Sequence, residues 1–277
     1  MIPEPIPDPE TILARDGLAA LELEGVLPAQ AYRAPEAMQA SVAAAPVREA
    51  PEDDGRQRDQ LIFGELFDVL EEIDGWCFGR ARRDGVVGWI EAAALSAPVI
   101  APTHRVAAIR TYAWAEPDAR SQPTMLLSLN ALVTARAEAG EFIEVERAGF
   151  IARAHLKDFL EFERDPAEVA ERFVGAPYQW GGRESLGLDD AALVQQALYA
   201  CGLGCPRHAE AQARELGRAV QRGDLRRGDL MFWSGQAGVL VDGERVAHAS
   251  PTALAVTVEP LAGLLGATTE APVFRRV

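Results

Sequence analysis

The 277-residue chain predicts an α+β protein that consists of two β-rich parts followed by a part of mixed structure. From about Met38 to about Leu160, short apolar runs alternate with turn residues, which is typical of β-structure. Within this stretch a short motif occurs twice, about sixty residues apart. From Asp165 onward, helical segments and strands alternate, and this mixture predicts an α+β domain.

The first residues are spaced by prolines, and residues 1–36 are predicted to form an N-terminal extension that is partly helical. The segment Thr11–Leu21 is long enough for one or two helical turns. The two β-rich parts are predicted over residues 37–98 and 103–160, with the linker between them near Ser96–Thr103.

The repeated motif ends each β-rich part. Gly88-Trp89-Ile90 in the first part is echoed by Gly149-Phe150-Ile151 in the second. Upstream, the turn Asp74-Gly75-Trp76 is matched by Ala139-Gly140-Glu141-Phe142. Two units that each end in Gly-aromatic-Ile resemble bacterial SH3-like domains, so the resemblance implies two small β-barrels.

The charge and the termini exclude several classes of partner. The formal net charge of −15 would repel phosphates, which argues against nucleic acid. No stretch approaches the length of a membrane span, and the start lacks the basic and apolar regions of an export signal. Three cysteines (Cys77, Cys201 and Cys205) do not make a disulfide framework. We therefore expect a cytoplasmic protein that binds neither nucleic acid nor a membrane.

Residues 165–277 carry a series of motifs in a fixed order. They are an aromatic entry run, a pair of aspartates, a proline-arginine pair, a Gly-Asp-Leu strand start and a His-Ala strand: Tyr178-Gln179-Trp180-Gly181-Gly182, Asp189-Asp190, Pro206-Arg207, Gly228-Asp229-Leu230 and His248-Ala249. The series resembles the NlpC family of papain-like cell-wall peptidases. The resemblance implies a papain-like NlpC-type domain behind two SH3-like barrels, an arrangement similar to that of cytoplasmic γ-D-glutamyl-diamino acid endopeptidases, which trim recycled murein peptides.

The chemistry of that family needs a thiolate at a helix N-terminus, a histidine base and a polar group that orients this histidine. The resemblance implies that Asp190 stands at the cysteine position, Gln236 at the position of the base and His248 at the orienting position. A glutamine side chain has no pKa that permits proton transfer near neutrality. A carboxylate at a helix N-terminus is stabilised as the anion and is a weak nucleophile. We predict no thiol-peptidase activity.

The resemblance also implies a substrate-binding set, which comprises Tyr178, Trp180, Arg183, Asp189, Ala191 and Arg207. Structural roles compete with this interpretation. Asp189 and Asp190 are ordinary helix-starting residues that cap N–H groups and favour the helix dipole. Tyr178 and Trp180 are also compatible with core aromatics, and His248 with a buried histidine bonded to the backbone.

Cys201, Cys205 and His208 form a Cys-x3-Cys-x2-His pattern, but three potential ligands fall short of a structural zinc site. The chain lacks the phosphate-loop, dinucleotide, zinc-peptidase and serine-hydrolase motifs. We predict no metal and no cofactor.

Three functions remain open. The first is a catalytically degenerate relative whose groove binds a murein-derived peptide without cleaving it. The second is an active peptidoglycan-peptide hydrolase that uses Asp190 and His248 in a non-standard site. The third is a scaffold that binds another protein.

Overall fold

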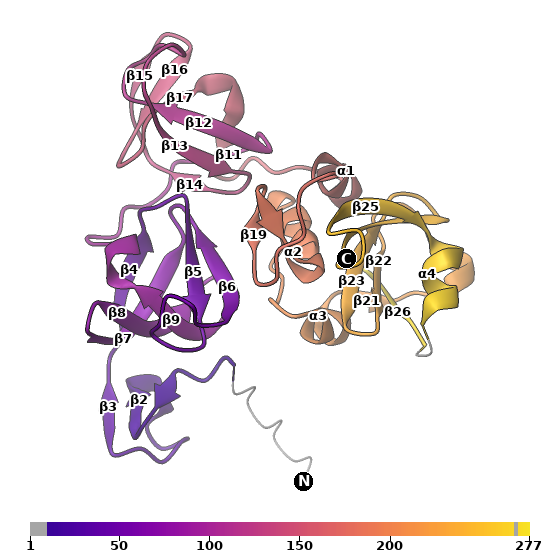
Figure 1. The fold of residues 1–277 in the computed structure, drawn as a ribbon, viewed down its shortest axis with the longest axis horizontal. Helices are drawn as coiled ribbons and strands as arrows, with labels where there is room; N and C mark the ends of the chain where they lie inside the picture. Colours follow the sequence, from indigo (N-terminus) through magenta and orange to yellow (C-terminus); the bar gives the residue numbers. More distant parts are fainter. Residues whose placement is uncertain (1–9, 269–270) are drawn as a thin grey trace. The chain divides into compact units, whose positions relative to one another are not determined.

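A computed structural model describes residues 10–268 and 271–277 (Figure 1). The chain divides into two compact units, Met1–Ile100 and Ala101–Val277. The first unit contains the N-terminal extension and barrel 1, which comprises strands β4 to β10. The second contains barrel 2, which comprises β11 to β18, and the C-terminal domain over residues 165–277.

The described part of the extension contains three strands and one 3-10 turn: β1 (Ala14–Arg15), β2 (Leu18–Ala20), β3 (Ala31–Arg33) and η1 (Leu21–Leu23). The helical turns predicted over Thr11–Leu21 are therefore wrong. Asp16 and Gly17 both have positive φ, 45° and 82°, which is the geometry of a tight β-hairpin turn. The dipeptide Asp-Gly at this place outweighs the helical propensity of its neighbours. Residues 1–9 of the predicted extension lie outside the described residues.

Barrel 1 is a sheet with the strand order β10-β4-β7-β8-β9-β5-β6. Its elements are β4 (Glu36–Ala40), β5 (Ala44–Arg48), β6 (Gln57–Ile62), β7 (Leu66–Ile73), β8 (Trp76–Ala81), β9 (Val87–Glu91), η2 (Ala92–Ala94) and β10 (Leu95–Ser96). Apolar side chains on the inner faces of these strands, such as Leu61, Phe67 and Ile90, form its core.

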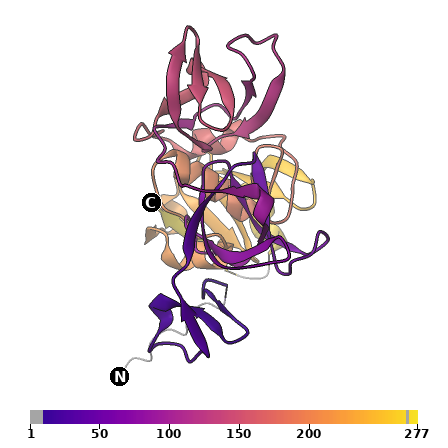
Figure 2. The same cartoon turned by 90° about the vertical axis from the view of Figure 1, so that its left-hand side faces the viewer.

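Barrel 2 contains a sheet ordered β14-β11-β18 and a second one ordered β13-β12-β17-β16-β15. Figure 2 shows its strands in magenta, curving around a common interior. The elements are β11 (His104–Val106), β12 (Arg110–Trp114), β13 (Pro123–Ser128), β14 (Leu132–Val133), β15 (Ala135–Ala139), β16 (Phe142–Val145), β17 (Gly149–Ala152), η3 (Arg153–His155) and β18 (Leu156–Asp158).

The repeated Gly-aromatic motif has the same structural reason in both barrels. Trp89 of β9 pairs with Arg48 of β5, and Phe150 of β17 pairs with Trp114 of β12. A Cβ on Gly88 would lie 2.7 Å from the Arg48 carbonyl oxygen, and a Cβ on Gly149 would lie 2.4 Å from that of Trp114. Only glycine permits so close an approach of two strands.

The C-terminal domain packs helices against a sheet ordered β21-β26-β22-β23-β24-β25. Helix α2 (Asp190–Ala200) is buried along its whole length, which explains its almost continuous apolar sequence. The remaining helices and turns are α1 (Pro166–Arg172), α3 (Ala209–Glu215), η4 (Arg222–Asp224) and α4 (Leu261–Ala267). The strands are β19 (Arg183–Glu184), β20 (Gly187–Leu188), β21 (Arg218–Ala219), β22 (Leu230–Trp233), β23 (Gln236–Leu240), β24 (Arg245–Ser250), β25 (Ala255–Pro260) and β26 (Val273–Arg276).

This architecture confirms the predicted α+β class. No helix in the part of the chain that the structure describes combines the length and the apolar character that a bilayer crossing requires.

Barrel 2 is joined to the C-terminal domain by buried polar contacts. The Arg105 guanidinium donates to the carbonyl oxygen of Ala200, the last residue of α2, at 2.9 Å. Asn130 Nδ2 donates to both the carbonyl and the side-chain oxygen of Gln196, at 2.9 and 2.8 Å. Barrel 2 therefore fixes the carboxyl-terminal half of the helix.

The barrel also holds the hairpin β19–β20, which precedes α2. The Ser185 N–H at the tip of this hairpin donates to Ser128 Oγ at 2.7 Å. The Ser185 carbonyl oxygen accepts from Arg110 at 3.0 Å. Strands of barrel 2 thus support the segment that leads into the start of α2.

Asn130 offers a test of this interface because two substitutions can separate the contribution of its side-chain hydrogen bonds from that of its backbone conformation. It is fully buried, and its φ of 68° is one that asparagine tolerates better than alanine. We expect Asn130→Ala to lower the free energy of unfolding by about 2–3 kcal/mol. Asn130→Gly relieves the backbone strain but not the loss of hydrogen bonds, so it should be destabilised by about 1–2 kcal/mol in urea denaturation. A glycine variant as stable as the wild type would show that the bonds to Gln196 contribute nothing.

Candidate functional site

Asp189 is the N-cap of α2 and the centre of a buried polar cluster. Its side chain accepts from the N–H of Ala192 at 2.8 Å and from the N–H of Gly181 at 2.9 Å. The Arg207 guanidinium binds both carboxylate oxygens, at 2.9 and 2.5 Å. The helix-start role that the sequence predicts for Asp189 is confirmed, and the same carboxylate ties the Trp180-Gly181 loop to the Pro206-Arg207 segment.

Asp190 is the first residue of α2 and is only 7% exposed. Its Oδ2 accepts from the backbone N–H of Ala237 at 2.6 Å, so the start of the helix is tied to the start of β23. Burial, followed by the negative charge of Asp189, raises the pKa of Asp190 to about 7. This carboxyl group therefore changes its protonation near neutral pH, and the expectation that the helix N-terminus stabilises it as the anion is wrong, because burial outweighs the helix dipole.

Gln236 and His248 lie on one face of the sheet. A Cβ on Gly238 would be 3.2 Å from the Cβ of His248, which places position 238 of β23 beside His248 of β24. Because side chains alternate along a strand, Gln236 points to the same side as position 238. The alternating residues Ala237 and Val239 instead pack with α2 in one apolar core, so Asp190 contacts β23 through the Ala237 N–H, while Gln236 and His248 lie on the other face of the sheet.

His248 is 2% exposed, and its Nε2 lies 3.1 Å from Glu259 Oε1. The ring packs against Trp233 with its centroid 5.3 Å away. Burial lowers the pKa of His248, so the imidazole is neutral at pH 7 and its Nε2–H donates to Glu259. The alternative of a bond from this histidine to the backbone is wrong, because its partner is a carboxylate.

The aromatic entry run lies next to the aspartates. Tyr178 is half-buried, and burial together with the charges of Asp190 and Asp189 raises its pKa to about 12. Trp180 is 57% exposed, which does not fit a plain core aromatic. Ala191 is buried, and its carbonyl oxygen accepts from Gln212 Nε2 at 2.9 Å.

Arg183 requires a correction. The resemblance implies a place in a substrate groove, but this side chain is 0% exposed and is one of the largest that are fully buried. Its guanidinium lies 5.6 Å from the centre of the Tyr199 ring, inside the domain. Arg183 therefore braces the interior beside α2, because the two-residue strand β19 turns it inward.

The sequence did not identify two participants in this site. The first is the Ala237 N–H. Its bond to Asp190 depends on where the backbone lies, so the identity of the side chain at position 237 does not predict it. Glu259 was recognisable in principle, since strand alternation in Thr257-Val258-Glu259 puts Thr257 and Glu259 on one face. The Thr257 hydroxyl donates to Glu259 Oε1 at 3.1 Å, which holds this carboxylate toward His248.

The cysteines lie outside this cluster. None of the three forms a disulfide bond in the described part of the chain. Cys201 caps the far end of α2, where burial raises the pKa of its thiol to about 11, and the buried Cys205 donates to the Pro206 carbonyl oxygen at 3.5 Å. Within residues 10–268 and 271–277, no group of three His, Cys, Asp or Glu side chains is arranged to hold a metal ion.

The start of α2 thus holds two buried carboxyl groups, of which Asp189 is bound by Arg207 and Asp190 by the Ala237 N–H. It is flanked by an exposed tryptophan and, across β23, by a neutral histidine paired with a carboxylate.

Comparisons with known proteins agree with this geometry. Residues 175–267 match the NlpC/P60 family, and residues 47–95 match the bacterial dipeptidyl-peptidase SH3 domain. A probable NlpC-homologous endopeptidase from Haemophilus influenzae is 34% identical over 112 residues, which are 39% of this chain and 60% of that protein. A gamma-D-glutamyl-L-lysine dipeptidyl-peptidase from Bacillus subtilis is 30% identical over 102 residues, which are 34% of each chain. The chain thus spans less than two thirds of the length of either relative.

The fold extends beyond these segments. A crystal structure of an NlpC/P60 family protein from Bacillus cereus superimposes with a TM-score of 0.76, covering 87% of this chain and 99% of that one at 17% identity. The resemblance drawn from the sequence motifs is therefore confirmed: the chain combines an SH3-like domain of the bacterial dipeptidyl-peptidase type with a C-terminal domain of the NlpC/P60 family.

Proposed function

We propose that this protein is a catalytically degenerate relative of the NlpC/P60 peptidoglycan hydrolases that binds a murein-derived peptide without cleaving it. The observation that carries the proposal is Asp190. A carboxylate stands at the first position of α2 and accepts the Ala237 N–H at 2.6 Å, where the family resemblance implies a reactive thiolate. A carboxylate held in this way is engaged by the protein and has little nucleophilic character.

The second half of the catalytic pair supports the same conclusion. Gln236 stands where the resemblance implies the histidine base, and an amide cannot take a proton from a nucleophile at neutral pH. His248 donates to Glu259, and its Nδ1 is buried without a hydrogen-bond partner among the described residues. A neutral histidine fixed in this way retains the orienting position but has no base to orient.

The binding part of the proposal rests on what the site retains. Asp189 and Arg207 form a buried pair that keeps the entry loop in place, and Trp180 remains exposed beside it. The relatives include a peptidase that is named for a γ-D-glutamyl-L-lysine bond, so the probe is L-Ala-γ-D-Glu-L-Lys. We expect measurable heat in a calorimetric titration of the wild type and no hydrolysis over many hours. Replacement of Trp180 by alanine is expected to weaken binding at least about 5-fold.

Restoration of activity tests the degeneracy directly. The double variant Asp190→Cys/Gln236→His supplies a thiol at the helix start and a base on β23, and we expect it to hydrolyse the same peptide. Each single variant lacks one of the two groups and serves as the matched control. Turnover by the wild-type protein that disappears in Asp190→Ala would overturn the proposal and favour a non-standard hydrolase. A well-folded double variant that neither binds nor cleaves would show that the groove itself has diverged.

The proposal includes a cytoplasmic location. It is supported by the three cysteines, none of which forms a disulfide bond among the described residues, because a reducing compartment disfavours disulfides.

A further inference from the structure

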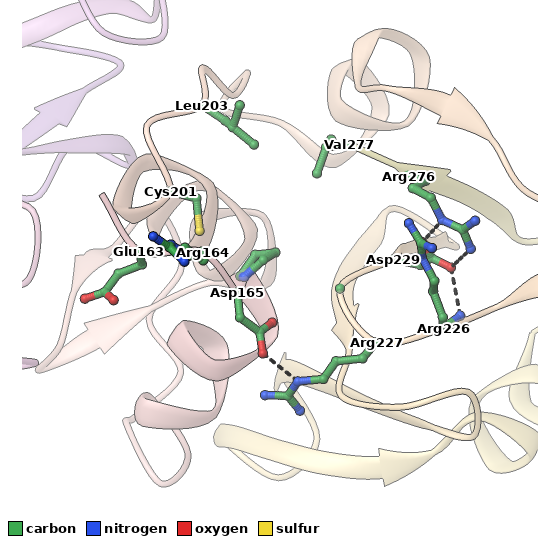
Figure 3. A pocket seen from close by; sticks show the side chains of 12 residues that line it. Glu163, Arg164, Asp165, Cys201, Leu203, Arg226, Arg227, Asp229, Arg276 and Val277 are labelled. Atoms are coloured by element: carbon green, nitrogen blue, oxygen red, sulfur yellow. Dashed lines mark hydrogen bonds and ion pairs between the residues drawn. The ribbon is translucent and has the colours of Figure 1, made fainter. Parts of the chain in front are cut away.

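A cavity of about 380 Å³ lies at the carboxyl end of α2 (Figure 3). Since α2 has 11 residues and a helix rises about 1.5 Å per residue, roughly 16 Å separate this end from Asp190. The segment 163–166 lines one wall together with Cys201 and Leu203, and the segment 226–229 with Arg276 and Val277 lines the other. The cavity is therefore distinct from the site at the helix start.

The carboxylates around this cavity already have partners. Glu163 binds Lys157 and Arg172, each at 3.2 Å, and its carboxylate points away from the opposite wall (Figure 3). Asp165 accepts from Arg227 at 2.6 Å and also from the Ala167 N–H, as the N-cap of α1.

The third carboxylate, Asp229, is buried, and Arg276 binds both of its oxygens, at 2.6 and 2.7 Å. The backbone N–H of Arg226 donates to the same group at 2.9 Å. All three acidic side chains of the lining are thus neutralised by neighbouring cations.

Only some of the guanidiniums that line the cavity form ion pairs with these carboxylates. Arg227 and Arg276 form the ion pairs described above, but the exposed side chains of Arg164 and Arg226 make no hydrogen bond or ion pair among the described residues. They stand on opposite walls, as Figure 3 shows. Two guanidiniums without a side-chain partner thus line one cavity, whose wall also includes the last residue, Val277.

We propose that this cavity binds a small molecule that carries an oxyanion, a phosphate or a carboxylate, between Arg164 and Arg226. A guanidinium presents a planar fork of N–H groups that matches such oxyanions. The volume lies within the range of small-molecule pockets, and Leu203 with Pro166 supplies an apolar surface for the rest of the ligand. The surrounding ion pairs keep Asp165 and Asp229 from competing for the two free guanidiniums.

Calorimetric titration of the full chain with pyrophosphate and with citrate, in dilute phosphate-free buffer, tests the proposal and separates the two chemistries. We expect one of them to bind one-to-one with a Kd below about 1 mM. Arg164→Ala and Arg226→Ala are each expected to weaken binding about 10-fold or more, since each removes a charged hydrogen bond. Arg120→Ala removes the same charge from an exposed loop of barrel 2 and should leave the affinity unchanged.

Absence of binding of both anions at about 10 mM would overturn the proposal. So would an affinity that Arg164→Ala and Arg226→Ala leave intact. If an alanine variant does not fold, lysine variants replace it, because lysine keeps the charge and loses the fork. They are expected to bind less tightly than the wild type, and equal affinity would contradict the assigned geometry.

Discussion

Replacement of Arg207 by alanine is expected to destabilise the C-terminal domain by about 3–5 kcal/mol, because it leaves the Asp189 carboxylate buried without its cation. The two side chains are only 2% and 9% exposed, so water cannot replace the lost partner. The same carboxylate holds Gly181 and caps α2, and the entry loop should loosen together with the helix start. Urea denaturation followed by tryptophan fluorescence measures the effect, since two of the five tryptophans, Trp180 and Trp233, lie in the C-terminal domain.

A matched control is Arg214→Ala, whose guanidinium pairs with Glu215 on the surface and should contribute less than about 1 kcal/mol. The double variant Asp189→Asn/Arg207→Met is informative as well. It removes both charges, keeps a side chain that can cap the helix, and should recover part of the loss. An Arg207→Ala protein as stable as the wild type would contradict the structural importance of this pair.

Replacement of Asp190 by asparagine should change how stability depends on pH. The pKa of Asp190 is raised to about 7 in the folded protein, against about 3.9 in an unfolded chain. Between these values the folded state holds the proton more tightly, so the stability of the wild type falls as pH rises from about 4 to about 7. The asparagine side chain does not titrate, and it keeps an oxygen that can accept from the Ala237 N–H.

We therefore expect Asp190→Asn to be more stable than the wild type at pH 8 by about 2 kcal/mol, and the difference to shrink toward pH 4. Measuring the difference between the two proteins cancels the titration of the groups that do not interact with Asp190. Asp118→Asn is the control, because Arg120 holds the pKa of Asp118 at about 2 and this group does not titrate over the range. A difference that does not change with pH would show that Asp190 is ionised throughout.

The motifs predicted the fold well because they mark positions where the backbone geometry permits only one residue type. Gly88 and Gly149 sit against the carbonyl oxygen of a neighbouring strand, so the same three-residue pattern recurs in both barrels. In the extension, by contrast, the Asp16-Gly17 turn decided the structure, although the flanking residues have helical propensity. In a short segment, a strong turn sequence such as Asp-Gly can thus determine a hairpin even where the neighbouring residues favour a helix.

The site was predictable only where a side chain acts through its own chemistry. Asp189 was identified as a cap because its position before an apolar helix requires one. The inward direction of Arg183 depends on the short hairpin β19–β20, which barrel 2 holds through Ser128, and no local pattern encodes this. The Ala237 N–H is a backbone group, so sequence alone could not reveal its bond to Asp190.

The bonds from Arg105 and Asn130 to α2 also determine how the second unit comes apart. The last turns of α2 cannot open to solvent without exposing a guanidinium and an amide that belong to barrel 2. Barrel 2 and this helix therefore form one cooperative folding element, and their amide hydrogens should exchange with solvent in the same opening event. A single cut in the exposed connection at Leu160 would leave the two fragments associated, because their attachment does not depend on the covalent link.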